Sequence, residues 1–317
     1  MTLSPSHSRP DYPNLQPIGV FDSGVGGLSV WRELTTLLPA ESTIYLADQA
    51  HVPYGARTAA DVEALTHEAA GWLLAQEAKL LVIACNTASA AALSSLRQRW
   101  PDVPIVGMEP AVKPASAQTL THKVGVMATP GTLNADRFVS LVERFASGVE
   151  VHTQVCPGLV ELVEAGDLDG PLVEAHLHSL LDPLVAADID HLVLGCTHYP
   201  FLAPAIQRVV GERVTLVDPA PAVARQAQRL LTTHDLLATG PLLALPTGPL
   251  LALPAGPLLA LPAGPLLALP AGGTAPTHRF FTTGDAAPLR ISIAQLLGLQ
   301  ASVEQASLAP RERGTGR

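Results

Sequence analysis

The sequence predicts an α/β protein made of two similar doubly wound parallel-sheet domains, related by pseudo-twofold symmetry, with the active site in the cleft between them. Short apolar runs of strand length alternate with longer helical stretches, an order typical of a parallel sheet covered by helices. Two of these runs, residues 80–84 and 191–195, are followed directly by Cys85 and Cys196. Ligands of such sheets bind just beyond the carboxyl ends of the strands, so both thiols are predicted to reach a ligand.

The two halves of the chain repeat this pattern with similar spacing. Gly19 and Gly125 open equivalent strands, and Cys85 and Cys196 close equivalent strands, with nearly the same number of residues between the members of each pair. This regularity indicates a duplicated α/β unit. If the two units face each other, the two cysteines approach one cleft from opposite sides.

The first half begins with a strand at residues 18–21, which the glycine-rich turn 22–27 follows. Glycines between a strand and a helix permit a sharp turn and expose helix N–H groups to an anion. Their spacing does not match the dinucleotide-binding pattern G-x-G-x-x-G. The other elements expected here are helices at 28–38, 61–77 and 88–100 and strands at 43–47, 80–84 and 103–108.

The pattern restarts at Glu109. We expect strands at 123–128, 149–155, 191–195 and 214–217, a loop at 129–132, and helices through 162–164 and at 135–145, 172–186, 201–210 and 221–231. The predicted first domain is discontinuous and comprises residues 17–108 and 219–300, and the second comprises residues 109–218. The tails 1–16 and 310–317 are expected to be disordered because of their composition.

An octapeptide, PLLALPTG and then PLLALPAG, is repeated over residues 241–272. Proline at two of every eight positions forbids a continuous helix and disfavours a central strand. We interpret the repeat as an insertion that expands a surface loop of the first domain. The functional alternative is a docking segment that exposes its leucines.

Composition excludes several classes of protein. The net charge is −9 and the sequence has no basic cluster, which argues against nucleic acid as a partner. No apolar run is long enough for a membrane span, and residues 1–10 lack the apolar core of a signal peptide, so we expect a cytoplasmic protein. Three cysteines do not suggest a disulfide framework.

Two thiols on opposite sides of a cleft suit proton transfer at a carbon atom. If one is a thiolate and the other a thiol, one removes a proton while the other delivers a proton to the opposite face, which inverts a stereocentre. Asp22, Glu164 and His198 are the candidates for setting the two protonation states. Alternatives remain for each residue: a buried cysteine is often an apolar filler, Asp22 could cap a helix, and His198 could be a structural donor. Cys156 has no symmetric partner and is interpreted as a filler.

The sequence predicts no cofactor and no metal. Pyridoxal phosphate requires a Schiff-base lysine, and the lysines, Lys79, Lys113 and Lys123, all lie outside the strand-end motifs. The histidines and cysteines show no zinc-site spacing such as C-x-x-C.

The segments FDSGVGGLSV, VPYG, ACNTASA, ATPGT, GCTHYP and TTGD, in this order, resemble the glutamate branch of the cofactor-independent aspartate, glutamate and hydantoin racemases. The resemblance covers residues 17–298 apart from the repeat. It implies interconversion of L- and D-glutamate, a supply of D-glutamate for peptidoglycan synthesis, and a homodimer.

The resemblance also assigns roles to individual residues. Cys85 and Cys196 match the acid–base cysteines, with Cys85 acting on D-glutamate and Cys196 on L-glutamate. The groups that match the assisting residues are Asp22, Glu164 and His198. The positions that match substrate-binding residues are Asp22, Ser23, Tyr54, Gly55, Asn86, Thr87, Thr129, Thr132, Thr197 and His198.

Three other functions remain open. The first is an aspartate racemase of the same family. The second is a non-catalytic protein that binds an acidic amino acid. The third is a hydrolase that uses Cys196 and His198, which would leave Cys85 without a role.

Overall fold

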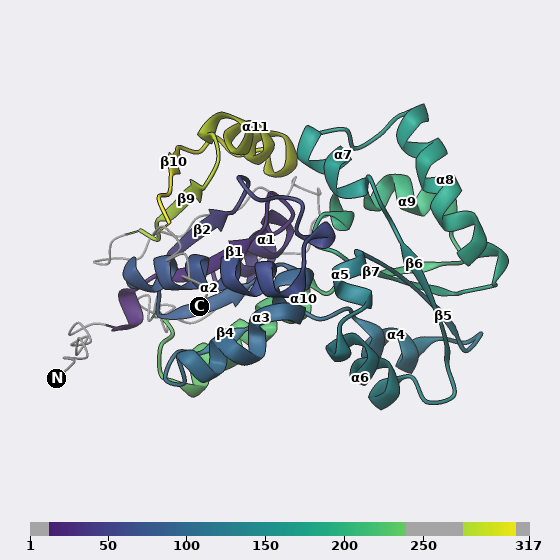
Figure 1. Ribbon diagram of the computed structural model, residues 1–317, viewed down its shortest axis with the longest axis horizontal. Coiled ribbons are helices and arrows are strands. Elements are labelled where there is room, and N and C mark those ends of the chain that lie inside the picture. Colours follow the sequence, from purple (N-terminus) through teal and green to yellow (C-terminus); the bar gives the residue numbers. More distant parts are fainter. Residues whose placement is uncertain (1–12, 239–274, 309–317) are drawn as a thin grey trace, which may run out of the picture.

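The computed structural model describes residues 13–238 and 275–308 (Figure 1). The predictions for residues 1–12, for the octapeptide repeat and for the C-terminal tail 310–317 lie outside the described residues. Residues 13–16, which we assigned to the N-terminal tail, include the 3-10 helix η1 (Pro13–Leu15). The ammonium group of Lys79 donates to the carbonyl oxygen of Asn14 at 2.6 Å, which holds this turn on the protein.

The first domain is built on a parallel sheet with the order β10-β9-β2-β1-β3-β4. Its strands are β1 (Ile18–Asp22), β2 (Thr43–Ala47), β3 (Leu80–Ile83), β4 (Ile105–Val106), β9 (His278–Thr282) and β10 (Val303–Gln305). The central strands β1, β2 and β3 are buried along their whole length. Strands covered on both faces have continuous apolar sequences, and this is the pattern from which they were predicted.

The second domain is built on a parallel sheet with the order β6-β5-β7-β8. Its strands are β5 (Lys123–Ala128), β6 (Glu150–Val155), β7 (His191–Gly195) and β8 (Thr215–Val217). This order is the same as β2-β1-β3-β4 in the first domain, so β3 and β7 occupy equivalent positions. The predicted fold class of two parallel-sheet α/β domains is confirmed.

Helices cover both sheets (Figure 1). Those of the first domain are α1 (Leu28–Leu37), η2 (Tyr54–Ala56), α2 (Ala59–Ala75), α3 (Asn86–Arg99), α10 (Ala220–Thr233) and α11 (Ala286–Leu297). Those of the second are α4 (Val112–Gln118), α5 (Pro130–Leu133), α6 (Asp136–Phe145), α7 (Leu159–Ala165), α8 (Pro171–Ala186), η3 (Tyr199–Leu202) and α9 (Ala203–Val210). Helix α10 packs against α1, which returns the chain to the first domain. No helix among the described residues is long and apolar enough to cross a membrane.

Two local expectations were wrong, and some elements were not expected. Residues 129–132 were expected to be a loop, but α5 begins at Pro130, whose fixed φ suits the first position of a helix. Strand β4 is shorter than the expected 103–108: it begins after Pro104, which has no N–H to donate to a neighbouring strand, and it ends at Val106. Helix α4 and strand β10 were not expected.

Candidate active site

A cavity of about 150 Å³ lies between the two domains, and both predicted cysteines line it. Cys85 follows β3 of the first sheet and Cys196 follows β7 of the second. Eight of the other predicted site residues share its wall: Ser23, Tyr54, Gly55, Asn86, Thr87, Thr129, Thr197 and His198. The remaining three, Asp22, Glu164 and Thr132, lie behind this wall and contact residues that form it. The volume restricts a ligand to a small molecule, since sites for drug-sized ligands are roughly 300–1,000 Å³.

Cys85 has only neutral hydrogen-bond partners. It is the N-cap of α3, and its sulfur accepts from the N–H of Ala88 at 3.5 Å. Its S–H donates to the hydroxyl of Ser23 at 3.6 Å. Burial, together with the negative charge of Asp22, raises the pKa of Cys85 to about 12, although the hydrogen bond from the N–H of Ala88 favours the thiolate. The free protein therefore holds Cys85 as a thiol at neutral pH.

Cys196 is placed beside charged groups. Its sulfur lies 3.6 Å from Nδ1 of His198, and Nε2 of the same ring lies 2.8 Å from Oε1 of Glu164. Burial alone would lower the pKa of His198, but the contacts with Cys196 and Glu164 raise that pKa well above its usual value. The imidazolium form can then donate one proton to each partner.

Glu164 reaches this histidine from α7 of the second domain, yet the first domain holds it in place. Its Oε1 accepts from the N–H of Val25 at 2.7 Å, and its Oε2 accepts from Nε2 of Gln49 at 3.1 Å. Burial opposes the charged form, but the hydrogen bonds from His198, Val25 and Gln49 lower the pKa of Glu164 overall. Glu164 is therefore a carboxylate at neutral pH.

Asp22 ends β1 and is completely buried. Its carboxylate accepts from the N–H of Gly24 at 2.8 Å and from the hydroxyl of Thr197 at 3.1 Å. Burial raises the pKa of Asp22, while the charge of His198 and the Gly24 hydrogen bond favour the ionised form. Asp22 acts on Cys85 through its charge, and its direct partner, Thr197, belongs to the Cys196 side.

The glycine-rich turn 22–27 makes room for these groups. A Cβ on Gly24 would lie 1.9 Å from Oε1 of Glu164, and a Cβ on Gly26 would lie 2.3 Å from Nδ1 of His198. Any side chain at these two positions would displace the hydrogen-bonded groups. The turn was expected to expose N–H groups to an anion, and one of them, that of Val25, does bind the Glu164 carboxylate.

A cluster of threonines joins the two domains on the other side of the cavity. The hydroxyl of Thr87 on α3 lies 2.9 Å from that of Thr129, which in turn lies 3.1 Å from that of Thr132. Close approach requires glycine here too, because a Cβ on Gly55 would lie 2.8 Å from Cβ of Thr129. The start of α5 thus places the hydroxyl of Thr129 at the cavity beside that of Thr87, with Thr132 behind them.

Asn86 and Tyr54 complete the polar lining. Both polar side-chain atoms of Asn86 are buried and have no hydrogen-bond partner among the described residues, so a ligand in the cavity can provide one. The hydroxyl of Tyr54 donates to Oδ2 of Asp48 at 2.6 Å, which fixes the ring.

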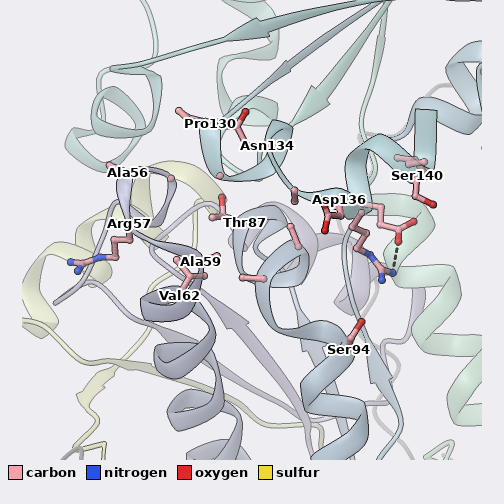
Figure 2. Close-up of a pocket in the computed structure, with 18 of the residues that line it drawn as sticks. Ala56, Arg57, Ala59, Val62, Thr87, Ser94, Pro130, Asn134, Asp136 and Ser140 are labelled. Atoms are coloured by element: carbon pink, nitrogen blue, oxygen red, sulfur yellow. Dashed lines mark ion pairs between the residues drawn. The ribbon is translucent and has the colours of Figure 1, made fainter. Parts of the chain in front are cut away.

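A larger cleft of about 960 Å³ lies next to the small cavity and is lined from η2, α2, α3, α5 and α6 (Figure 2). The two share Gly55, Ala56, Thr87 and Pro130. An ion pair between Arg137 and Glu109 forms part of the cleft wall. None of the thiols lines this cleft, so the candidate chemistry belongs to the smaller cavity. Within residues 13–238 and 275–308, no three His, Cys, Asp or Glu side chains are grouped so that they could bind a metal.

Sequence reasoning did not assign Cys156, Gln49 or Glu161 to this site, and Glu161 lines the cavity. Cys156, which we interpreted as a filler, lines the cavity. Gln49, which contacts Glu164, was not considered. Their positions in the sequence were the available signal. Cys156 follows β6 directly, and Gln49 lies two residues beyond β2. Both are therefore near the carboxyl end of a strand, where ligands of parallel sheets bind.

Taken together, the fold and cavity define a two-domain α/β protein with paired thiols at equivalent strand ends. The model of the Asp/Glu/Hydantoin racemase family matches residues 18–227. The chain belongs to this family.

The proteins similar to this chain include several glutamate racemases. The chain is 56% identical over 228 residues to a glutamate racemase from Ectopseudomonas mendocina, a match that spans 72% of this chain and 87% of the relative. Among solved structures, a glutamate racemase isoform from Bacillus anthracis matches with a TM-score of 0.74 and 32% identity, over 92% of this chain and 98% of the other. A glutamate racemase from Francisella tularensis, solved in complex with D-glutamate, matches with a TM-score of 0.73 and 29% identity, over 93% and 98% of the two chains.

Proposed function

We propose that this protein is a glutamate racemase that interconverts L- and D-glutamate by two-base proton transfer between Cys85 and Cys196. The observation that carries the proposal is that these two thiols come from equivalent strands of two domains and line one small cavity. The similarity to glutamate racemases supports glutamate as the substrate. The Francisella tularensis relative binds D-glutamate.

In the proposed L-to-D direction, the reaction starts with Cys196 as a thiolate and Cys85 as a thiol. With L-glutamate bound, the Cys196 thiolate, stabilised by the His198 imidazolium, removes the α-proton and becomes a thiol. The Cys85 thiol then delivers its proton to the opposite face of the α-carbon, which yields D-glutamate and a Cys85 thiolate. In the D-to-L direction the same two steps run in reverse. No cofactor or metal enters this scheme.

Substrate binding relies on neutral donors. Thr87, Thr129 and the amide of Asn86 line the cavity together with Ser23 and Thr197, and no lysine or arginine does so among the described residues. Hydroxyl and amide donors, with backbone N–H groups at the start of α3, suit carboxylates. The proposed assisting groups are Asp22, Glu164 and His198, and Thr132 holds Thr129 and Thr87 in position.

The wider proposal rests on the family resemblance. It includes a role in supplying D-glutamate for peptidoglycan, a cytoplasmic location and a homodimeric assembly. It also includes the domain boundaries, with residues 17–108 and 219–300 in the first domain and 109–218 in the second. Sedimentation velocity of the purified chain tests the assembly, since a monomer at micromolar concentration would contradict a homodimer.

The decisive experiment is to add L-glutamate to purified protein and follow the loss of optical rotation to zero. The same measurement with L-aspartate tests the alternative substrate within the family. Racemisation of aspartate but not glutamate would replace the proposed substrate. Binding of glutamate without turnover would identify an acidic amino-acid binding protein instead.

A further inference from the structure

The side chain of Gln49 connects the two domains directly behind the Cys196 side of the cavity. Its Nε2 donates to Oε2 of Glu164 at 3.1 Å, and its Oε1 accepts from the hydroxyl of Thr282 at 3.1 Å. Gln49 and Thr282 belong to the first domain, whereas Glu164 belongs to α7 of the second. A single amide therefore joins the end of β9 to the carboxylate that contacts His198.

The orientation of this amide is determined by its surroundings. The hydroxyl of Thr282, which is fully buried, accepts the N–H of Gly284 at 3.1 Å and so has its own proton free to donate. That proton requires the carbonyl oxygen of Gln49 on its side, since the amide nitrogen cannot accept it. The NH₂ group of Gln49 is thereby directed at Glu164.

The helix that carries Glu164 rests against the first domain. Figure 1 shows α7 beside α11, and a Cβ on Gly166, directly after α7, would lie 2.6 Å from Oε1 of Gln295 on α11. The Glu164 carboxylate has three donors: Val25, Gln49 and His198. Two of the three come from the first domain, so the geometry of Glu164 depends on how the domains are packed.

We propose that Gln49 is a positioning residue that fixes the Glu164 carboxylate against His198 and thereby keeps His198 in the imidazolium form beside Cys196. The inference rests on the proposed racemase function and adds a residue to it. Gln49 does not line the cavity, so it acts through Glu164 and not on the substrate.

The charged and titratable groups around Glu164 determine the direction in which the pKa values of Glu164 and His198 should change when Gln49 is replaced. His198 faces it directly, and Asp22 and Tyr45 interact with it electrostatically. Removing the amide leaves Oε2 without its hydrogen-bond donor, which raises the pKa of Glu164 because a hydrogen bond to the charged form is lost. A Glu164 carboxylate that is protonated, or that contacts His198 less closely, stabilises the imidazolium less. The pKa of His198 is then lowered.

The test is the variant Gln49→Met, which keeps the length of the side chain and removes both hydrogen bonds. Its matched control is Gln226→Met on α10, where the side chain accepts only a local hydrogen bond from Arg229 at 3.0 Å. In Gln49→Met we expect kcat to fall about tenfold, a size typical of losing a hydrogen bond to a charged group. The control should match the unmodified protein.

Two readouts separate positioning from a general structural effect. NMR of histidine-labelled protein should show the pKa of His198 lowered in Gln49→Met. With α-deuterated substrate, the primary isotope effect should rise mainly in the L-to-D direction, in which Cys196 removes the proton. Thr282→Val, which removes only the hydroxyl that orients the amide, should produce smaller changes of the same sign. This variant replaces Gln49→Met in the test if Gln49→Met fails to fold.

An unchanged His198 pKa together with an unchanged isotope effect would overturn the inference, even if kcat falls. The NMR titration does not depend on turnover. If the unmodified protein does not racemise glutamate, the proposed function fails, while a lowered His198 pKa in Gln49→Met would still establish the positioning by Gln49.

Discussion

The two sides of the cavity are alike in fold and different in electrostatics. Cys85 and Cys196 follow equivalent strands, β3 and β7, of sheets with the same strand order. Cys85 is surrounded by a hydroxyl and a backbone N–H, whereas Cys196 stands next to a histidine that is paired with a carboxylate. Duplicated backbones can thus place two thiols symmetrically, while the groups that surround the two thiols differ.

The largest effect on activity is expected when each of the two thiols is removed in turn. Cys85→Ala or Cys196→Ala should each lower racemisation by at least about 10²-fold, since each removes a general acid or base. Circular dichroism of the variants should show an intact fold, and optical rotation with glutamate measures the activity. Cys156→Ala, whose side chain also lines the cavity, is the control and should retain most activity. Full activity after loss of Cys85 or Cys196 would refute the two-base mechanism.

The assisting groups allow a finer comparison. His198→Asn should raise the primary isotope effect with α-deuterated substrate mainly from L to D, and Asp22→Asn mainly from D to L, because each weakens help to one thiol. Since the enantiomers have equal free energies in water, kcat/KM must stay equal in the two directions. The isotope effects and the separate kcat values therefore carry the information. If both variants changed the isotope effect equally in both directions, His198 and Asp22 would not each assist one particular thiol.

The pH dependence of the free energy of unfolding tests the surroundings of Cys85 without any measurement of turnover. The pKa of Cys85 is raised from 9.0 to about 12. The unfolded chain releases this proton above about pH 9 while the folded protein retains it, so the free energy of unfolding should decrease as pH rises through this window. Cys156, with a pKa also raised to about 12 by burial, contributes in the same direction.

Urea unfolding at pH values on either side of 9 measures this effect, and Cys85→Ala should make the decrease shallower. An equally steep decrease in that variant would show that Cys85 is not the buried thiol described here. At the acid end, Glu164 has a lowered pKa, so its contribution to stability is present above its ordinary pKa and is lost as pH falls through the folded value.

The smallest effect is expected from deletion of residues 241–272, which should leave both thiol sides equally active. The described residues before and after this segment both bind near the start of β2. The N–H of Ala238 donates to the carboxylate of Glu41 at 2.7 Å, and the N–H of Thr43 donates to the carbonyl oxygen of Thr277 at 2.9 Å. This place is the start of β2, whereas the site lies beyond the end of that strand. Loop-closure entropy changes slowly with length, so stability should change little as well. A deletion variant that loses activity or changes its oligomeric state would reveal a role for the repeat.

The sequence alone determined the two parallel-sheet domains and the position of both cysteines. Buried parallel strands require continuous apolar runs, and the residue after such a run lies at the sheet edge where ligands bind. These are local properties, so the runs before Cys85 and Cys196 were sufficient to predict them. The same rule, applied to every strand, would also have drawn attention to Cys156 and Gln49.

Only the tertiary structure decided which groups surround each thiol. Glu164 contacts Val25 and Gln49 across 139 and 115 positions of the chain, and Thr197 contacts Asp22 across 175. Hydrogen bonds of this kind form only when the packing of two domains brings the partners within about 3 Å with the correct direction. No periodicity or spacing encodes that distance. The symmetric part of the site was therefore predictable from the sequence, whereas the different surroundings of the two thiols came from the packing of α7 and the turn 22–27 against each other.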